Sequence, residues 1–115
     1  MVDSNDLLQE ILKKLEAEYF KGTGGNKLTK EVGVYFNSYI QDVAETAGII
    51  KEMWCLGHIT PLIAKKMALV LNRSIETIIL ASVGQGLVAV DKAKSLSDGL
   101  LEDTLQLLLT FILGI

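Results

Sequence analysis

Apolar side chains recur at helical spacing along most of the chain, and we find no convincing strand pattern. The clearest repeat lies within residues 28–56, where six apolar positions follow at intervals of four, three, four, three and four: Phe36, Ile40, Val43, Ala47, Ile50 and Trp54. This spacing is typical of a seam along which one helix packs lengthwise against another. It predicts a long central helix in an all-α protein. Gly33 and Gly48 weaken that helix, so a kink or break near either glycine is an open alternative.

Capping residues indicate further helices on both sides of this segment. Asp3 or Ser4 is expected to cap a first helix that runs to about Phe20, where the glycine-rich residues 21–27 interrupt the pattern. Thr60-Pro61 combines an N-cap residue with proline at the first helical position, which is typical of a helix start.

The helix that starts at Pro61 is expected to end near Asn72, and Ser74 then caps a fourth helix over about 75–94. The length suits one domain over residues 1–115. It divides into an N-terminal helix with its glycine-rich loop (1–27), the long helix (28–57) and a three-helix C-terminal part (60–115). The prediction is therefore an all-α fold of about five helices.

A fifth helix, opened by Ser97 or Asp98, would complete an apolar C-terminal hairpin and is apolar on nearly every side. Such a helix must be enclosed, and a chain of 115 residues rarely encloses one of its helices fully. We therefore expect neighbouring subunits to cover it, chiefly over four side chains: Leu105, Leu108, Phe111 and Ile112.

A stripe of small residues marks the expected fourth helix. Its members recur at intervals of four, three and four: Ser82, Gly86, Ala89 and Ala93. Small residues along one line let two helix backbones approach closely and gain dispersion contacts. The close contact lies either between subunits or with another helix of the same chain.

The composition argues against most site chemistry. The chain is 50% apolar and 22% charged, which excludes a disordered protein, and it has one cysteine and one histidine. Gly57 is expected to end the helix between Cys55 and His58, and Cys55 is expected in the core. We predict no catalytic, metal-binding or cofactor-binding residue, no small-molecule substrate and no enzyme activity.

Two segments nevertheless resemble part of a DNA-binding domain. Residues 42–49 resemble the opening helix and turn of a helix-turn-helix, and residues 60–76 are similar to the helices that follow it in phage-repressor-like domains. The resemblance covers about a third of the chain. It implies phosphate contacts by Lys65, Lys66 and Arg73, whereas the net charge of −3 has the wrong sign for a protein that lives on phosphate backbones.

The leading hypothesis from the sequence is a non-enzymatic structural subunit that assembles with copies of itself or close paralogues. A filament, shell, inclusion or phage-like particle would be built from such a subunit. The alternative is a small helix-turn-helix regulator, and a third is a short membrane hairpin with residues 91–98 as its polar tip. The first residues are polar and acidic, so we expect no signal peptide and a location in the cytoplasm or within an assembled particle.

Overall fold

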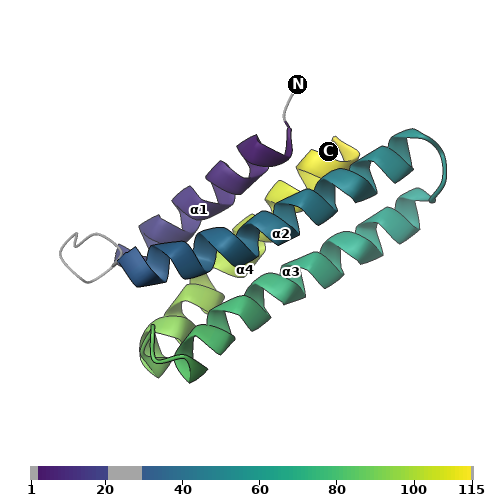
Figure 1. The fold of residues 1–115 in the computed structure, drawn as a ribbon. Coiled ribbons are helices and arrows are strands. Elements are labelled where there is room, and N and C mark those ends of the chain that lie inside the picture. Colours follow the sequence, from purple (N-terminus) through teal and green to yellow (C-terminus); the bar gives the residue numbers. More distant parts are fainter. Residues whose placement is uncertain (1–2, 21–29, 115) are drawn as a thin grey trace.

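The computed structural model describes residues 3–20 and 30–114 of the chain. These residues form four helices and no strand: α1 (Ser4–Phe20), α2 (Lys30–Cys55), α3 (Pro61–Gly84) and α4 (Val90–Leu113) (Figure 1). The all-α prediction is confirmed, and the expected number of about five helices is corrected to four in the part described. The glycine-rich segment 21–27 lies outside the described residues.

Both predicted helix starts are confirmed by their capping hydrogen bonds. The Asp6 amide donates to the Asp3 carboxylate at 2.9 Å, and the Asp3 amide donates back to the Asp6 carboxylate at 3.2 Å. At α3, the Ile63 amide donates to the Thr60 hydroxyl at 3.2 Å, with Pro61 at the start of the helix. Each cap satisfies amides that have no partner within the first helical turn.

The predicted division between a third and a fourth helix is wrong. Residues 72–74 lie inside α3, where the Ser74 hydroxyl donates to the Val70 carbonyl four residues earlier, at 3.1 Å, and does not cap a new helix. The chain turns later, at residues 85–89, where Gly86 has a φ of 70°. Glycine adopts this backbone conformation at no steric cost, so the turn falls at Gly86. The segment from residue 60 onward therefore contains two described helices, not three.

The long central helix is confirmed, and it continues through Gly33 and Gly48 without a break. The first five residues of its predicted seam are buried, and Trp54 is half-buried. Gly48 faces α1, and a Cβ atom at this position would overlap the Ser4 side chain. Gly48 thus leaves room for the Ser4 side chain at the start of α1.

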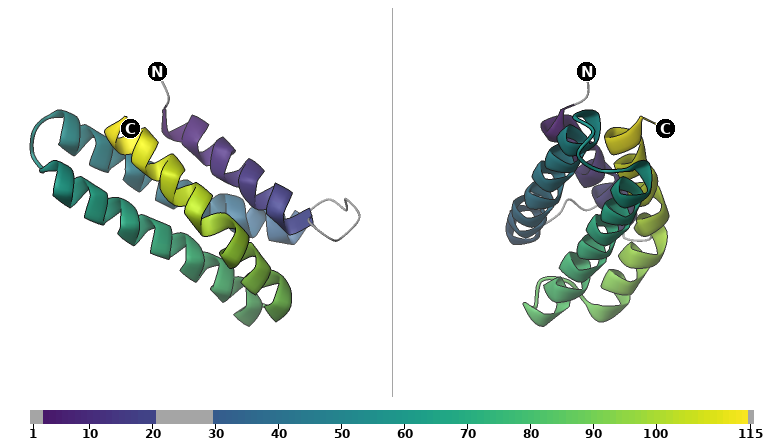
Figure 2. Two further views of the ribbon diagram at one scale, coloured as in Figure 1. Left: turned by 180° about the vertical axis from the view of Figure 1, so that it is seen from behind. Right: turned by 90° about the vertical axis from the view of Figure 1, so that its right-hand side faces the viewer.

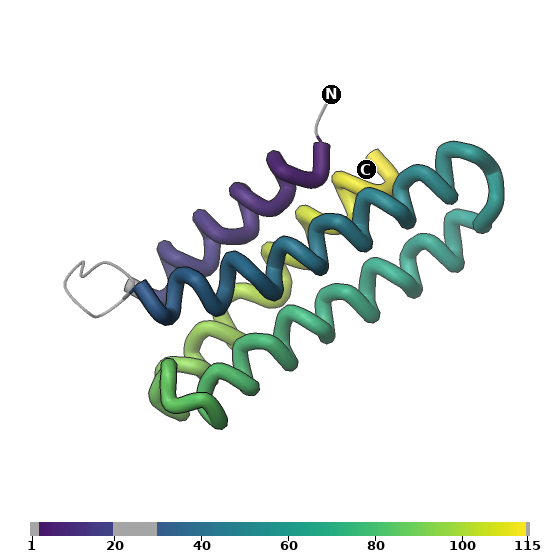
Figure 3. Tube along the Cα trace, viewed as in Figure 1, coloured from purple at the N-terminus to yellow at the C-terminus, as the bar shows by residue number. Residues whose placement is uncertain are grey.

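The four helices form an elongated bundle of 45 × 23 × 21 Å (Figures 1 and 3). Consecutive helices run in opposite directions, and in the view from behind α4 lies in front of α2, between α1 and α3 (Figure 2, left). Every pair of described helices is in contact except α1 and α3. α2 and α4 are therefore the central pair, whereas α1 and α3 flank them and each has more of its circumference exposed.

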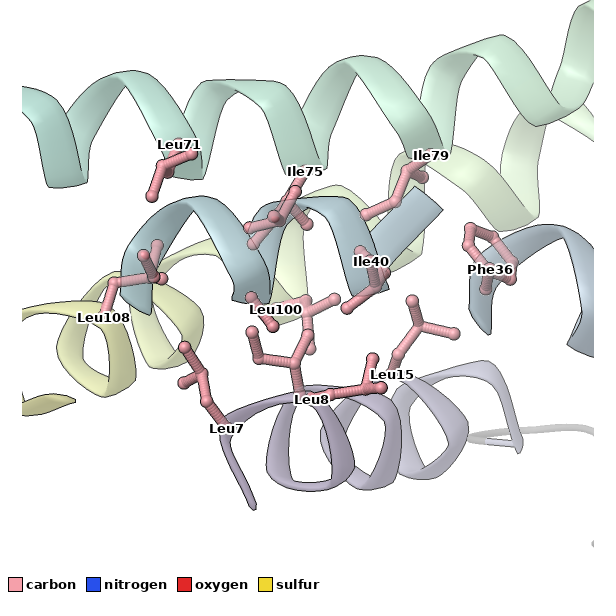
Figure 4. Packing of buried hydrophobic residues seen from close by; sticks show 14 of the residues in the cluster. Leu7, Leu8, Leu15, Phe36, Ile40, Leu71, Ile75, Ile79, Leu100 and Leu108 are labelled. Carbon is pink, nitrogen blue, oxygen red and sulfur yellow. The ribbon is translucent and has the colours of Figure 1, made fainter. Parts of the chain in front are cut away.

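All four helices contribute to one apolar core. Figure 4 shows Leu8 and Leu15 of α1, Ile40 of α2, Ile75 of α3 and Leu100 of α4 pointing toward one another. A polar link also joins α3 to α4 at Thr104, which is fully buried. The Thr104 hydroxyl donates to the Asn72 side-chain carbonyl, and the Asn72 amide donates to the Leu101 carbonyl at 2.9 Å. Because buried polar groups need partners, this link holds the two helices in register.

Candidate association surface

Both the inner and the outer side of α3 carry apolar side chains, and the outer side also carries the exposed charges of Lys66 and Arg73. Its inner face is buried in the bundle and consists of small and medium-sized residues: Ala64, Ala68, Leu71, Ile75, Ile79 and Ser82. Its outer side carries five large apolar side chains that are 42–62% exposed: Leu62, Ile63, Leu69, Val70 and Leu80. We call these five residues the α3 patch. A surface helix normally presents polar residues on this side.

A groove runs between α2 and α3 beside this patch. It has a volume of about 510 Å³ and is lined mainly by apolar and aromatic side chains, among them Tyr35, Tyr39, Val70 and Ile78. The Tyr35 hydroxyl donates to the Ile78 carbonyl at 2.7 Å and links the two helices at this point. Burial raises the pKa of Tyr35, and the neighbouring Tyr39, whose ring centroid is 4.9 Å away, raises it further. Among the described residues that line this groove, Arg73 is the one charged residue.

The exposed charges on the two helices that flank the groove have opposite signs. The exposed carboxylates of α2 are Glu31, Asp42, Glu45 and Glu52, against one exposed ammonium group, that of Lys30 at its first residue. The exposed charged residues of α3 are all basic: Lys65, Lys66 and Arg73. Glu76, the acidic residue of α3, is half-buried. Glu45 lines a hollow beside α1 and lies away from the groove, whereas Asp42 follows Tyr35 by about two helical turns and therefore lies on the groove side. The side formed by α2 and α3 thus carries the Asp42 carboxylate on α2 and the Arg73 guanidinium on α3.

The side chains expected to form the contact between subunits lie mostly inside the chain. Leu108, Phe111 and Ile112 are buried, and Leu105 is half-buried. The expectation that they need cover from a neighbour is wrong, because α1, α2 and α3 together already provide it. The other three helices enclose α4 more completely than its length and apolar content predict.

The expected small-residue stripe does not lie on one helix. Ser82 is near the end of α3 and Ala93 is near the start of α4, and both are buried within the chain. Gly86 and Ala89 lie between them in the exposed turn. The stripe is therefore corrected to two helix ends and the turn that joins them.

The helix-turn-helix resemblance fails at its turn. Residues 42–49 are continuous helix within α2, so no second helix starts after Gly48. Residues 91–98, the proposed tip of a membrane hairpin, are likewise helical, within α4. Lys65, Lys66 and Arg73 are exposed on α3.

A second hollow of about 820 Å³ opens between the N-terminal part of α1 and the C-terminal ends of α2 and α4. Leu7, Trp54 and Phe111 line its apolar part, and the Lys51 ammonium lies 4.6 Å from the centroid of the Phe111 ring. Cys55 lies at its edge and is exposed, so its expected place in the core is wrong. Within residues 3–20 and 30–114, no three His, Cys, Asp or Glu side chains gather in a way that could hold a metal ion.

The α3 patch was missed because the sequence from residue 61 to 84 was divided into two shorter helices. Taken as one helix, this segment has apolar residues on both its inner and outer sides, and that signal is present in the sequence. Among the described helices, α3 alone is long and apolar enough to cross a membrane, by length and composition only. Comparison with protein-family models, with curated proteins and with solved structures found no match for this chain.

Proposed function

We propose that this chain is a non-enzymatic structural subunit that associates with copies of itself through the α3 patch and the adjoining groove. The observation that carries the proposal is the exposure of five large apolar side chains on one side of one helix. Val70 lies at the α2–α3 groove and Leu80 at the hollow beside α4, and exposed Lys66 and Arg73 lie among the five residues. Several large exposed apolar side chains on one helix are typical of an interaction surface, whereas single scattered ones need no explanation.

Burial of the patch would supply a substantial driving force. A Val, Leu or Ile side chain contributes about 1.5–3 kcal/mol when fully buried, and these five are already 38–58% covered, from exposures of 42–62%. Partial burial of several such side chains offsets much of the entropy lost when two molecules associate. An interface of ordinary size, about 1,600 Å² in total, would have to extend beyond α3. The groove and the outer side of α2 provide that additional surface.

The test is the molar mass in solution over a range of protein concentrations. Size-exclusion chromatography with light scattering should show a dimer or larger assembly that dissociates on dilution. Val70→Lys should weaken association at least about tenfold, because the substitution replaces a 59% exposed apolar side chain with a charge. Lysine also favours helix formation, so the fold should persist.

Ala17→Lys provides the matched control. Ala17 is exposed on α1, which does not contact α3, and the substitution adds the same charge. Its molar mass should equal that of the unmodified chain. If the unmodified chain stays monomeric at millimolar concentration, self-association is ruled out.

A second candidate is association with a lipid bilayer through α3. The observation in its favour is that only 28% of the most apolar 18-residue stretch of this helix is buried in the bundle. Sedimentation with neutral phospholipid vesicles, lost in Val70→Lys and kept in Ala17→Lys, would support this candidate. A chain that stays in the supernatant at every lipid concentration would exclude it.

A further inference from the structure

The opposite charges of α2 and α3 restrict how a second copy can cover this face. Two copies related by a two-fold axis parallel to the helices bring α2 of each copy against α3 of the other. An axis perpendicular to the helices, in the plane of the interface, brings α2 against α2 and α3 against α3. The second arrangement opposes exposed carboxylates to carboxylates and cations to cations, which is unfavourable.

The central charges of the two helices stand at nearly the same height. α2 and α3 are antiparallel, and the hydrogen bond from Tyr35 to Ile78 aligns them. Asp42 lies seven residues along α2 from Tyr35, and Arg73 lies five residues back along α3 from Ile78. At about 1.5 Å of rise per residue, the two are displaced from the Tyr35 level by about 10 Å and 8 Å, near the middle of both helices. Both are exposed.

We infer that the partner seated on the α3 patch is a second copy of this chain, with its α2 lying along α3 and the Asp42 carboxylate of each copy facing the Arg73 guanidinium of the other. This inference rests on the proposed self-association and specifies its geometry. The contact is isologous, because the same residues of both copies exchange the same interactions. Two ion pairs flank the axis, and the side chains that line the groove, Val70 among them, lie between the two copies.

Charge reversal tests the pairing. In Asp42→Arg, two arginines face each other at both positions of the homodimer, and in Arg73→Asp two carboxylates do so. Each variant alone should therefore dissociate at a concentration about tenfold higher than the unmodified chain. Mixing the two variants places opposite charges at both positions again. An equimolar mixture should recover the dissociation constant of the unmodified chain to within about twofold, and native mass spectrometry should show the heterodimer.

The control variant is Glu16→Arg, which reverses an exposed carboxylate on α1 and should leave association unchanged. Circular dichroism of each variant checks that the exposed substitutions leave the helices intact. If the unmodified chain and both single variants associate equally well, the inferred pairing is overturned, whereas the proposed self-association still holds. Weakened single variants whose mixture does not recover would also overturn it. An unmodified chain that is monomeric would overturn both.

Discussion

At the level of single residues, Gly33 and Gly86 differ in whether the backbone needs a glycine. Gly33 is inside α2, where a Cβ atom would meet no atom within 4 Å. Gly86 has a φ of 70° in the turn between α3 and α4, a conformation that residues with a Cβ atom adopt at a cost. Gly33 therefore makes α2 less stable than an alanine would, whereas Gly86 allows the backbone conformation of the turn.

The same substitution should therefore have opposite effects at the two sites. Gly33→Ala should raise the free energy of unfolding by about 0.5–1 kcal/mol, because alanine loses less conformational entropy in a helix. Gly86→Ala should lower it by about 1–2 kcal/mol through strain in the left-handed region. Urea unfolding followed by Trp54 fluorescence measures both. A neutral Gly86→Ala variant would contradict the turn geometry.

At the scale of elements, Tyr35 joins α2 to α3 through its hydrogen bond to the Ile78 carbonyl. Its pKa is raised from the ordinary value of 10.0, first by burial and then by Tyr39. An unfolded tyrosine ionises near 10.0, whereas folded Tyr35 keeps its proton to higher pH. The stabilisation is thus fully present below pH 10 and is lost as the pH rises through the folded pKa.

Tyr35→Phe should separate this contribution from that of the other groups that titrate in the same range. The variant should lose about 1 kcal/mol of stability at neutral pH, because the hydrogen bond is gone. Its stability should then fall less steeply than that of the unmodified chain as the pH rises above 10. Unfolding by urea at fixed pH values measures the two slopes. Parallel slopes would mean that Tyr35 titrates alike in both states.

The helices could be predicted from the sequence where the signal is local. The seam from Phe36 to Trp54 and the cap at Thr60 are patterns of neighbouring residues, and both are confirmed. The break expected at Ser74 was wrong because a serine hydroxyl can either cap a helix or, inside one, donate to the carbonyl four residues earlier, as Ser74 does. The packing of the bundle decides between these alternatives.

The sequence shows which residues of α3 are apolar, but it does not show which of them the bundle covers. Leu108 and Leu69 look alike in the sequence, yet Leu108 is fully buried and Leu69 is 43% exposed. Which of the two is covered depends on the order of helices around the bundle, where α4 lies in the centre and α3 at the side. That order is a property of the tertiary arrangement, and no spacing within one helix encodes it.

At the scale of the whole molecule, the elongated bundle presents one long side formed by α2 and α3. A two-fold contact along this side closes after two copies, because each copy uses the same surface that it covers. Association would then add to the stability of the folded state by mass action, since only folded chains form the dimer. The midpoint of thermal unfolding should therefore depend on protein concentration.

Each tenfold increase in protein concentration should raise the Tm of the unmodified chain by about 2–4 °C. One folded dimer yields two unfolded chains, so a higher concentration favours the folded dimer. The Tm of a domain of this size changes by several degrees for each kcal/mol of stability. Differential scanning calorimetry between 10 µM and 1 mM measures the slope. Val70→Lys should unfold at nearly the same temperature across the range, while Ala17→Lys should keep the slope of the unmodified chain. Of the two variants, only Val70→Lys changes the α3 patch. If the Tm depends on concentration equally in all three proteins, α3 therefore does not carry the contact between copies.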